Sequence, residues 1–232
     1  MKTAVMQPYF FPYLGYWQML NAVDKFVILD DVNYIKRGYI NSNSILINGK
    51  AHKFTISIEK PSQNKLINET KLFFPKEERE RLLRTVDNAY KKADCYSAFF
   101  SVFKSIVLYD SSDLTEYLKN SLIEVSKYLD VRTEILLSSE IEKNNSLKAE
   151  ERIIEINKCL GSDVYINAIG GQALYDAKHF RDVGIDLKFI KMGDVKYRQY
   201  NNEFVPNLSF IDVLMFNGIN STKQLLEQYE LI

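Results

Sequence analysis

The chain has 232 residues, of which 46% are hydrophobic and 26% charged, a composition typical of globular proteins. Its 30 basic and 30 acidic residues cancel, which argues against the excess positive charge of nucleic-acid-binding proteins. No apolar run approaches the roughly 18 residues of a membrane span, no secretory signal is visible, and two cysteines make no disulfide framework, so we expect a cytoplasmic protein.

The first part of the chain predicts a βαβ unit followed by a hairpin. An apolar run, a helix-like segment and a second apolar run occupy residues 2–6, 15–24 and 25–31. This succession is typical of two parallel strands joined by a helix. Residues 44–58 then alternate between apolar and polar types around Asn48–Gly49, the pair that favours a type I′ turn. We therefore predict a β-hairpin there.

The middle of the chain has a helical pattern. Pro75 suits the first position of a helix, and the acidic residues that follow it favour the positive end of the helix dipole. Leucines then recur at helical spacing as far as Leu129. The sequence therefore predicts a mostly helical insertion over about residues 75–130.

The last hundred residues return to alternating strands and helices. Strands are expected at residues 133–139, 163–167 and 185–192, and helices at 148–161, 175–184 and 206–218. Glycines end the first two of these helices, and the third is expected to begin at a cap on Asn207 and to stop at Asn217–Gly218. We predict a single α/β domain over residues 1–232, with an open, mostly parallel Rossmann-like sheet, the hairpin and the helical insertion.

Polar residues and glycines follow most of the predicted strands. In open parallel sheets, ligands bind outside the carboxyl ends of the strands. These ends carry Gln7, Asp30, Asp31, Ser138, Ser139, Asn167, Gly170, Gly171 and Lys191. We expect Gln7, Asn167 and the glycine pair to contact a substrate, because adjacent glycines permit close backbone approach.

The stretch MQPYFFPYLGYW, residues 6–17, lies between the first predicted strand and helix. Its Tyr13-x-Gly15-Tyr16 has the spacing of the His-x-Gly-His of nucleotidylyltransferases, with both histidines replaced. Tyrosine cannot supply cationic stabilisation to a phosphoryl transition state, so the spacing favours binding over adenylyl transfer. We expect Tyr9, Tyr13 and Tyr16 to contact substrate; the alternative is an aromatic plug over the sheet edge.

The segment DDVNYIKRGYINSN, residues 30–43, is the densest polar cluster. Asp31 could act as a general base if it is partly desolvated. Lys36 and Arg37 could bind a phosphate or carboxylate. The remaining expected contacts from this segment are Tyr34, Asn41 and Asn43. The alternative is a solvated loop with a surface ion pair.

Outside these segments the candidate residues are few. His52, in the second hairpin strand, is either a half-buried structural histidine or a catalytic base. Cys159 is expected to be a buried structural thiol. Tyr197 and Gln199 either close the pocket or belong to a surface connection. No histidine or cysteine spacing matches a zinc site, so we predict no metal, and the sequence identifies no cofactor.

Four blocks of the sequence resemble the WbqC-like family of bacterial proteins. They are MQPYFFPYLGYW, DDVNYIKRGYIN, NKCLGSDVYINAIGGQALYD and FVPNLSFIDVLMFN, and together they run over essentially the whole chain. The positions that match the family motifs are Gln7, Pro8, Pro12, Gly15, Asp31, Lys36, Arg37, Asn41, Asn43, Cys159, Gly170, Gly171, Tyr197 and Gln199. The family often has arginine where this chain has Ser42 and Ser44, which leaves Lys36 and Arg37 to bind phosphate.

The resemblance implies a role in surface-polysaccharide biosynthesis, including lipopolysaccharide and O-antigen. It implies a transferase that adds glycine or another acyl group to the amine of a nucleotide-linked sugar. Asp31, His52 and Lys36 are then the expected catalytic residues, with an acyl or aminoacyl donor or a carrier protein as second partner. The alternatives are a non-catalytic sugar-nucleotide-binding or scaffold protein and a degenerate nucleotidylyltransferase-like enzyme. The sequence does not indicate an oligomeric state.

Overall fold

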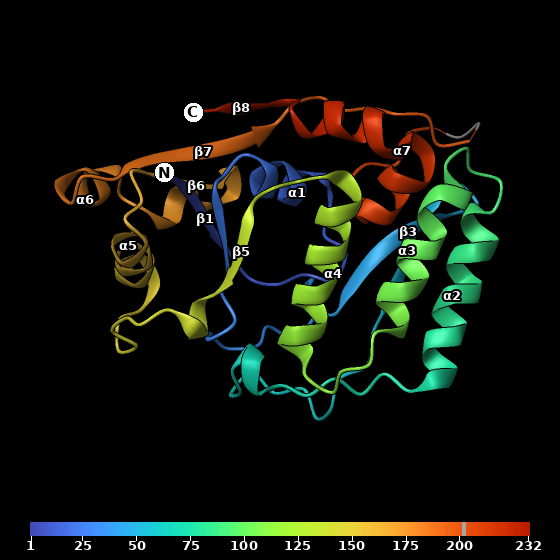
Figure 1. The fold of residues 1–232 in the computed structure, drawn as a ribbon, viewed down its shortest axis with the longest axis horizontal. Helices are drawn as coiled ribbons and strands as arrows, with labels where there is room; N and C mark the ends of the chain where they lie inside the picture. The colour runs from blue at the N-terminus through green and yellow to red at the C-terminus, as the bar shows by residue number, and fades with distance from the viewer. Residues whose placement is uncertain (201–202) are drawn as a thin grey trace.

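The computed structural model, which describes residues 1–200 and 203–232, contains a six-stranded sheet and a separate hairpin (Figure 1). The sheet is built from β1 (Lys2–Met6), β2 (Lys25–Ile28), β5 (Glu134–Leu137), β6 (Val164–Ala168), β7 (Asp186–Met192) and β8 (Tyr229–Leu231). The strand order is β5-β2-β1-β6-β7-β8, and only the β7–β8 pair is antiparallel. The predicted α/β fold with a mostly parallel sheet is confirmed.

Helices cover both faces of the sheet. They are α1 (Leu14–Asn21), α2 (Lys76–Tyr90), α3 (Tyr96–Leu108), α4 (Leu114–Leu129), α5 (Ala149–Leu160), α6 (Ala177–Asp182) and α7 (Phe210–Leu226), with short 3-10 turns η1 (Ile67–Glu69), η2 (Ser138–Glu140) and η3 (Ile169–Leu174). Successive strand residues point to opposite faces. Phe26 and Ile28 therefore join the core formed with α1, α3, α4 and α7, whereas Val27 joins the smaller core formed with α5 and α6.

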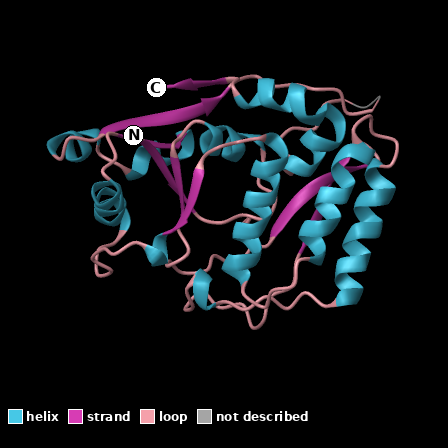
Figure 2. Ribbon diagram, viewed as in Figure 1, coloured by secondary structure: helices cyan, strands magenta, loops and turns pink. Residues whose placement is uncertain are grey.

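The hairpin lies apart from the main sheet, beside the helices of the insertion (Figure 2). It consists of β3 (Ser42–Ile47) and β4 (Lys50–Thr55). Asn48 and Gly49 have φ angles of 50° and 74°, the left-handed values that a type I′ turn requires at both central positions. The hairpin and its turn are therefore as predicted.

The C-terminal region differs from the prediction in two ways. Helix α7 is capped by Ser209, whose Oγ accepts a hydrogen bond from Ile211 N, and not by Asn207. The helix is interrupted at Gly218, whose φ of 63° and ψ of −171° are not helical, so its first part stops at Asn217–Gly218 as predicted. The second part, whose Leu225 and Leu226 are buried in the core, was not predicted. Strand β8, which follows, was not predicted. Among the described residues, no helix combines the length and apolar character needed to cross a bilayer.

Candidate functional site

The direction in which successive strands are added to the sheet reverses between β1 and β6. Strands β1, β2 and β5 run outward to one edge, and β6, β7 and β8 run outward to the other. In open α/β sheets, the crevice outside the carboxyl ends at such a switch point is the usual ligand site. The loop of residues 7–13, which joins β1 to α1, begins at this point.

The aromatic residues of this loop divide into two sets. Phe10 and Phe11 are fully buried and pack against rings from the hairpin and the insertion, including Phe54, Tyr117 and Phe103. Tyr9 is half-buried and Tyr13 is 37% exposed. The loop therefore both fills the core and presents aromatic faces to solvent.

Hydrogen bonds hold the loop in an unusual backbone conformation. Phe11 has a φ of 44°, a left-handed value that is rare for a bulky residue. Its carbonyl accepts from Asn43 Nδ2 at 2.6 Å and from Ser209 Oγ at 2.9 Å. Phe210 N donates to the carbonyl of Pro12 at 3.0 Å. The loop is thus fixed from β3 on one side and from the start of α7 on the other.

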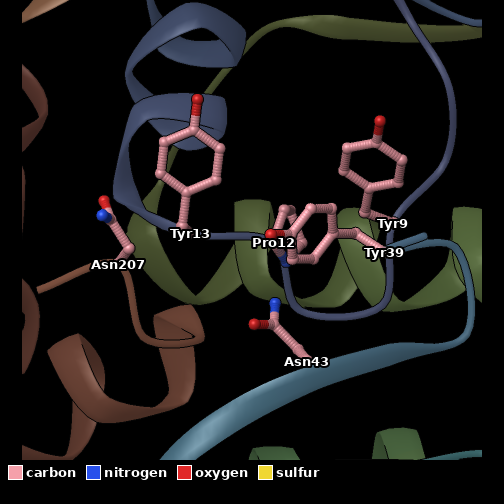
Figure 3. A pocket seen from close by; sticks show the side chains of 6 residues that line it. All are labelled: Tyr9, Pro12, Tyr13, Tyr39, Asn43 and Asn207. Atoms are coloured by element: carbon pink, nitrogen blue, oxygen red, sulfur yellow. The ribbon is translucent and has the colours of Figure 1, made fainter. Parts of the chain in front are cut away.

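A pocket of about 280 Å³ opens beside this loop, and we call it the tyrosine pocket. It is lined by Tyr9, Pro12, Tyr13, Tyr39, Asn43 and Asn207. Figure 3 shows the rings of Tyr9 and Tyr13 on opposite sides with their hydroxyls pointing the same way, and Pro12 and Tyr39 between their bases. Asn207 lies beside Tyr13. Aromatic walls with a few amides and hydroxyls are typical of small-molecule sites.

Among the described residues, none that lines the tyrosine pocket carries a charged side chain. Burial, followed by the neighbouring tyrosines, raises the pKa of Tyr9 and Tyr13, so their hydroxyls are neutral at physiological pH. The nearest charges in sequence are Lys36 and Arg37, which are exposed on the loop that ends in Tyr39. Neither makes an ion pair with any other described residue. The pocket itself is therefore suited to a neutral group, and charge could be bound only at its margin.

The absence of a side chain at Gly15 leaves room for the ring of Tyr13. A Cβ at Gly15 would lie 2.6 Å from Cε2 of Tyr13, so the ring rests against the first turn of α1. The glycine of the Tyr-x-Gly-Tyr motif therefore accommodates an aromatic ring in this chain.

Three of the expected contact residues, Tyr16, Tyr34 and Asn41, do not line the tyrosine pocket but hold the segments that line it. Tyr16 is buried, packs on Tyr9 with ring centroids 5.6 Å apart, and donates to the carbonyl of Gln7 at 3.0 Å. Tyr34 donates to Asn41 Oδ1 at 2.8 Å, and Asn41 Nδ2 donates to the carbonyl of Ile56 in turn. These bonds fix the loop that carries Tyr39 to the hairpin.

Asp31 lies in a buried ion-pair cluster rather than in the tyrosine pocket. Its Oδ2 is 2.8 Å from Lys143 Nζ and 2.5 Å from Arg152 Nη2, and the exposed fractions of the three side chains are 9%, 1% and 12%. Burial raises the pKa of Asp31, but Lys143, with Ser138 and Arg152, outweighs it and the pKa is lowered. Asp31 is therefore a weak base, and it fixes the loop after β2 to the segment after β5.

The other predicted residues at the carboxyl edge lie outside the tyrosine pocket. Asn167 is buried and its Oδ1 accepts from Ala168 N; its side chain occupies the space that a Cβ on Gly171 would need. Gly170 is exposed with nothing close to it. His52 is exposed, not half-buried, because β4 is an edge strand of a two-stranded sheet. Cys159 is also exposed, so the expected burial of this thiol is wrong.

Tyr197 and Gln199 converge on a residue that the sequence did not single out, Asp212. This buried carboxylate accepts from Tyr197 Oη at 2.8 Å, from Gln199 Nε2 at 2.7 Å and from Tyr90 Oη at 2.7 Å. Burial nevertheless raises the pKa of Asp212. Tyr197 also lines a small second pocket that shares Tyr13 and Asn207 with the tyrosine pocket. The network thus positions the segment that leads to Asn207.

Comparison with known proteins gives one family and one relative. The model of the WbqC-like protein family matches residues 7–224. "Uncharacterized protein Rv1507c" of Mycobacterium tuberculosis is 23% identical over 219 residues, which cover 93% of each chain. No solved structure matches.

Proposed function

The chain belongs to the WbqC-like protein family, and from this premise we propose that the tyrosine pocket binds a nucleotide-linked amino sugar. The protein then acts in surface-polysaccharide biosynthesis as a transferase that adds glycine or another acyl group to the sugar amine. The observation that carries the proposal is the pocket itself, which three tyrosines and two asparagines line beside the loop that follows β1.

The pocket supports binding and orientation of such a substrate. Its aromatic faces offer stacking surfaces, and its tyrosine hydroxyls and the amide of Asn207 offer neutral hydrogen-bonding groups. Lys36 and Arg37, on the loop that ends in Tyr39, are suited to an anionic diphosphate. Of the three predicted catalytic residues, Lys36 is the closest to Tyr39 in the chain, and unlike Asp31 it is exposed, so we propose that it assists transfer.

A non-catalytic sugar-nucleotide-binding protein of the same pathway is the second candidate. One observation favours it: Asp31 is held in an ion pair with a lowered pKa, and His52 is exposed on the hairpin. Acyl transfer to an amine requires a group that accepts the proton of the attacking nitrogen. Within residues 1–200 and 203–232, no carboxylate or imidazole lines the tyrosine pocket.

Mass spectrometry separates the two candidates. Purified protein is incubated with dTDP- and UDP-linked amino sugars and with glycyl or acyl donors in the form of thioesters and adenylates. A transferase increases the mass of the sugar nucleotide, and Lys36→Gln slows this increase without preventing folding. Binding of the sugar nucleotide with no mass increase for any donor would instead support the non-catalytic function.

Replacing Gly15 by alanine is expected to reduce ligand affinity while leaving stability unchanged or slightly raised. The new Cβ displaces the Tyr13 ring, whereas alanine in a helix is favoured over glycine by about 0.5–1 kcal/mol. Nucleotide-sugar titrations and urea unfolding measure the two effects. Unchanged affinity in a folded Gly15→Ala protein would exclude Tyr13 from the binding site.

A further inference from the structure

We propose, resting on the proposed function for a nucleotide ligand, that the tyrosine pocket holds the base of that nucleotide and not its sugar. The phosphates then lie outside the pocket, beside Lys36 and Arg37. The sugar with its reactive amine lies beyond the phosphates and away from the tyrosines.

The shape and chemistry of the lining favour a flat ring. Pro12 and the rings of Tyr9, Tyr13 and Tyr39 present mostly apolar faces. Tyr13 and Tyr39 are 37% and 63% exposed, so large parts of these rings are open to a ligand. Every nucleobase has two aromatic faces that can stack on such rings.

The polar groups of the lining are too few for a sugar ring that carries hydroxyls at most of its carbons. Asn43 is committed to the protein, because its Nδ2 donates to the carbonyl of Phe11 and its Oδ1 accepts from Ser44 N. The hydroxyls of Tyr9 and Tyr13 point away from Pro12. A hydroxylated ring placed against Pro12 would lose hydrogen bonds to water without replacing them.

Asn207 supplies what a base edge needs. It lies beside Tyr13, its side chain is exposed, and it makes no side-chain hydrogen bond to another described residue. Its φ of 58° is a left-handed value that asparagine tolerates better than most residues. An amide presents one donor and one acceptor side by side, the arrangement that pairs with the edge of a nucleobase.

The charge distribution places the phosphates outside. A phosphate inside an uncharged pocket would be desolvated without a counter-charge. Lys36 and Arg37 lie in the same loop as Tyr39, exposed to solvent. A nucleotide whose base contacts Tyr39 can therefore extend its phosphates along this loop.

The test compares the two halves of the ligand by calorimetry and saturation-transfer NMR. The probes are UMP, dTMP, CMP, AMP and GMP on one side and amino-sugar 1-phosphates on the other. We expect at least one nucleoside monophosphate to bind at least tenfold more tightly than any sugar phosphate, with the strongest saturation transfer at the base protons. Tyr39→Ala and Tyr13→Ala should each weaken this binding by about tenfold or more.

Phe73→Ala is the matched control, since Phe73 is a 59% exposed aromatic residue outside the pocket and should not affect binding. Sugar phosphates that bind as tightly as the nucleotides, with the same sensitivity to Tyr39→Ala, would overturn the base assignment while keeping the proposed function. Binding of neither class would overturn both. Nucleotide binding that neither tyrosine variant weakens would overturn the assignment of the base to this pocket.

Discussion

Replacing Asp31 by alanine is expected to lower the free energy of unfolding by about 3–5 kcal/mol. The substitution leaves Lys143 and Arg152 buried without their shared carboxylate, whose Oδ2 is 2.8 Å and 2.5 Å from their nitrogens. Uncompensated buried charge is among the most destabilising changes a point mutation can make. Urea unfolding monitored by circular dichroism measures the loss.

The surface pair of Asp194 and Lys196 provides the matched control. The side chain of Asp194 is 86% exposed, so Asp194→Ala should change the free energy of unfolding by less than about 1 kcal/mol. Equal effects of the two alanine substitutions would contradict the assignment of Asp31 to a buried anchoring cluster.

The stability that Asp31 contributes is also expected to depend on pH. Its folded pKa is lowered, so the contribution is present above the ordinary aspartate pKa of about 3.9 and is lost as pH falls through the folded value. The difference between wild type and Asp31→Ala should therefore narrow in acid. A difference that stays constant between neutral pH and pH about 2 would contradict this.

Replacing Asp212 by alanine is expected to cost a similar amount, about 3–5 kcal/mol. The carboxylate accepts hydrogen bonds from Tyr90, Tyr197 and Gln199, and its removal leaves Gln199 Nε2 with only the carbonyl of Val205 and takes the acceptor from both tyrosine hydroxyls. For a chain of this length the melting temperature should fall by about 6–20 °C. Because Tyr197 and Gln199 precede Asn207 in the chain, nucleotide affinity should fall as well.

Tyr197→Phe is the graded control for this network. It removes one donor and leaves the carboxylate with two, so the expected cost is about 1–2 kcal/mol. A melting temperature of Asp212→Ala within error of the wild type would show that the network does not hold the segment before α7.

Local sequence signals predicted much of the fold. The Asn48–Gly49 turn and the glycine that ends α5, Gly161, need only φ > 0 at one or two positions, and both have it. Gly218 carries a similar signal, and its non-helical φ of 63° and ψ of −171° interrupt α7 where the sequence predicts a stop. The helical segment after Gly218 was not predicted, because its Leu225 and Leu226 are buried through tertiary contacts.

The candidate site was predicted less completely, because its residues meet through tertiary contacts. Tyr9 and Tyr13 were expected from their place between strand and helix, and both line the pocket. Tyr39 belongs to the polar segment of residues 30–43 but was not among the expected contacts. Asn207 was interpreted as a helix cap, and its role in the lining depends on how the segment before α7 returns to the first loop.

The buried charges illustrate the same limit. Lys143 and Arg152 carry no local pattern that identifies them as partners of Asp31, since they lie far along the chain and the pairing of β2 with β5 brings their segment to it. Asp212 had a signal that could have been used. It is a single acidic residue in the apolar run FIDVLMF, and such a residue requires buried donors.

A structure of the protein with a bound nucleotide-linked amino sugar tests the central claim most directly. We expect the ligand in the tyrosine pocket, with its base against Tyr9, Tyr13 and Tyr39 and its diphosphate at Lys36 and Arg37. A ligand bound instead over Gly170–Gly171, with the tyrosine pocket empty, would contradict the account.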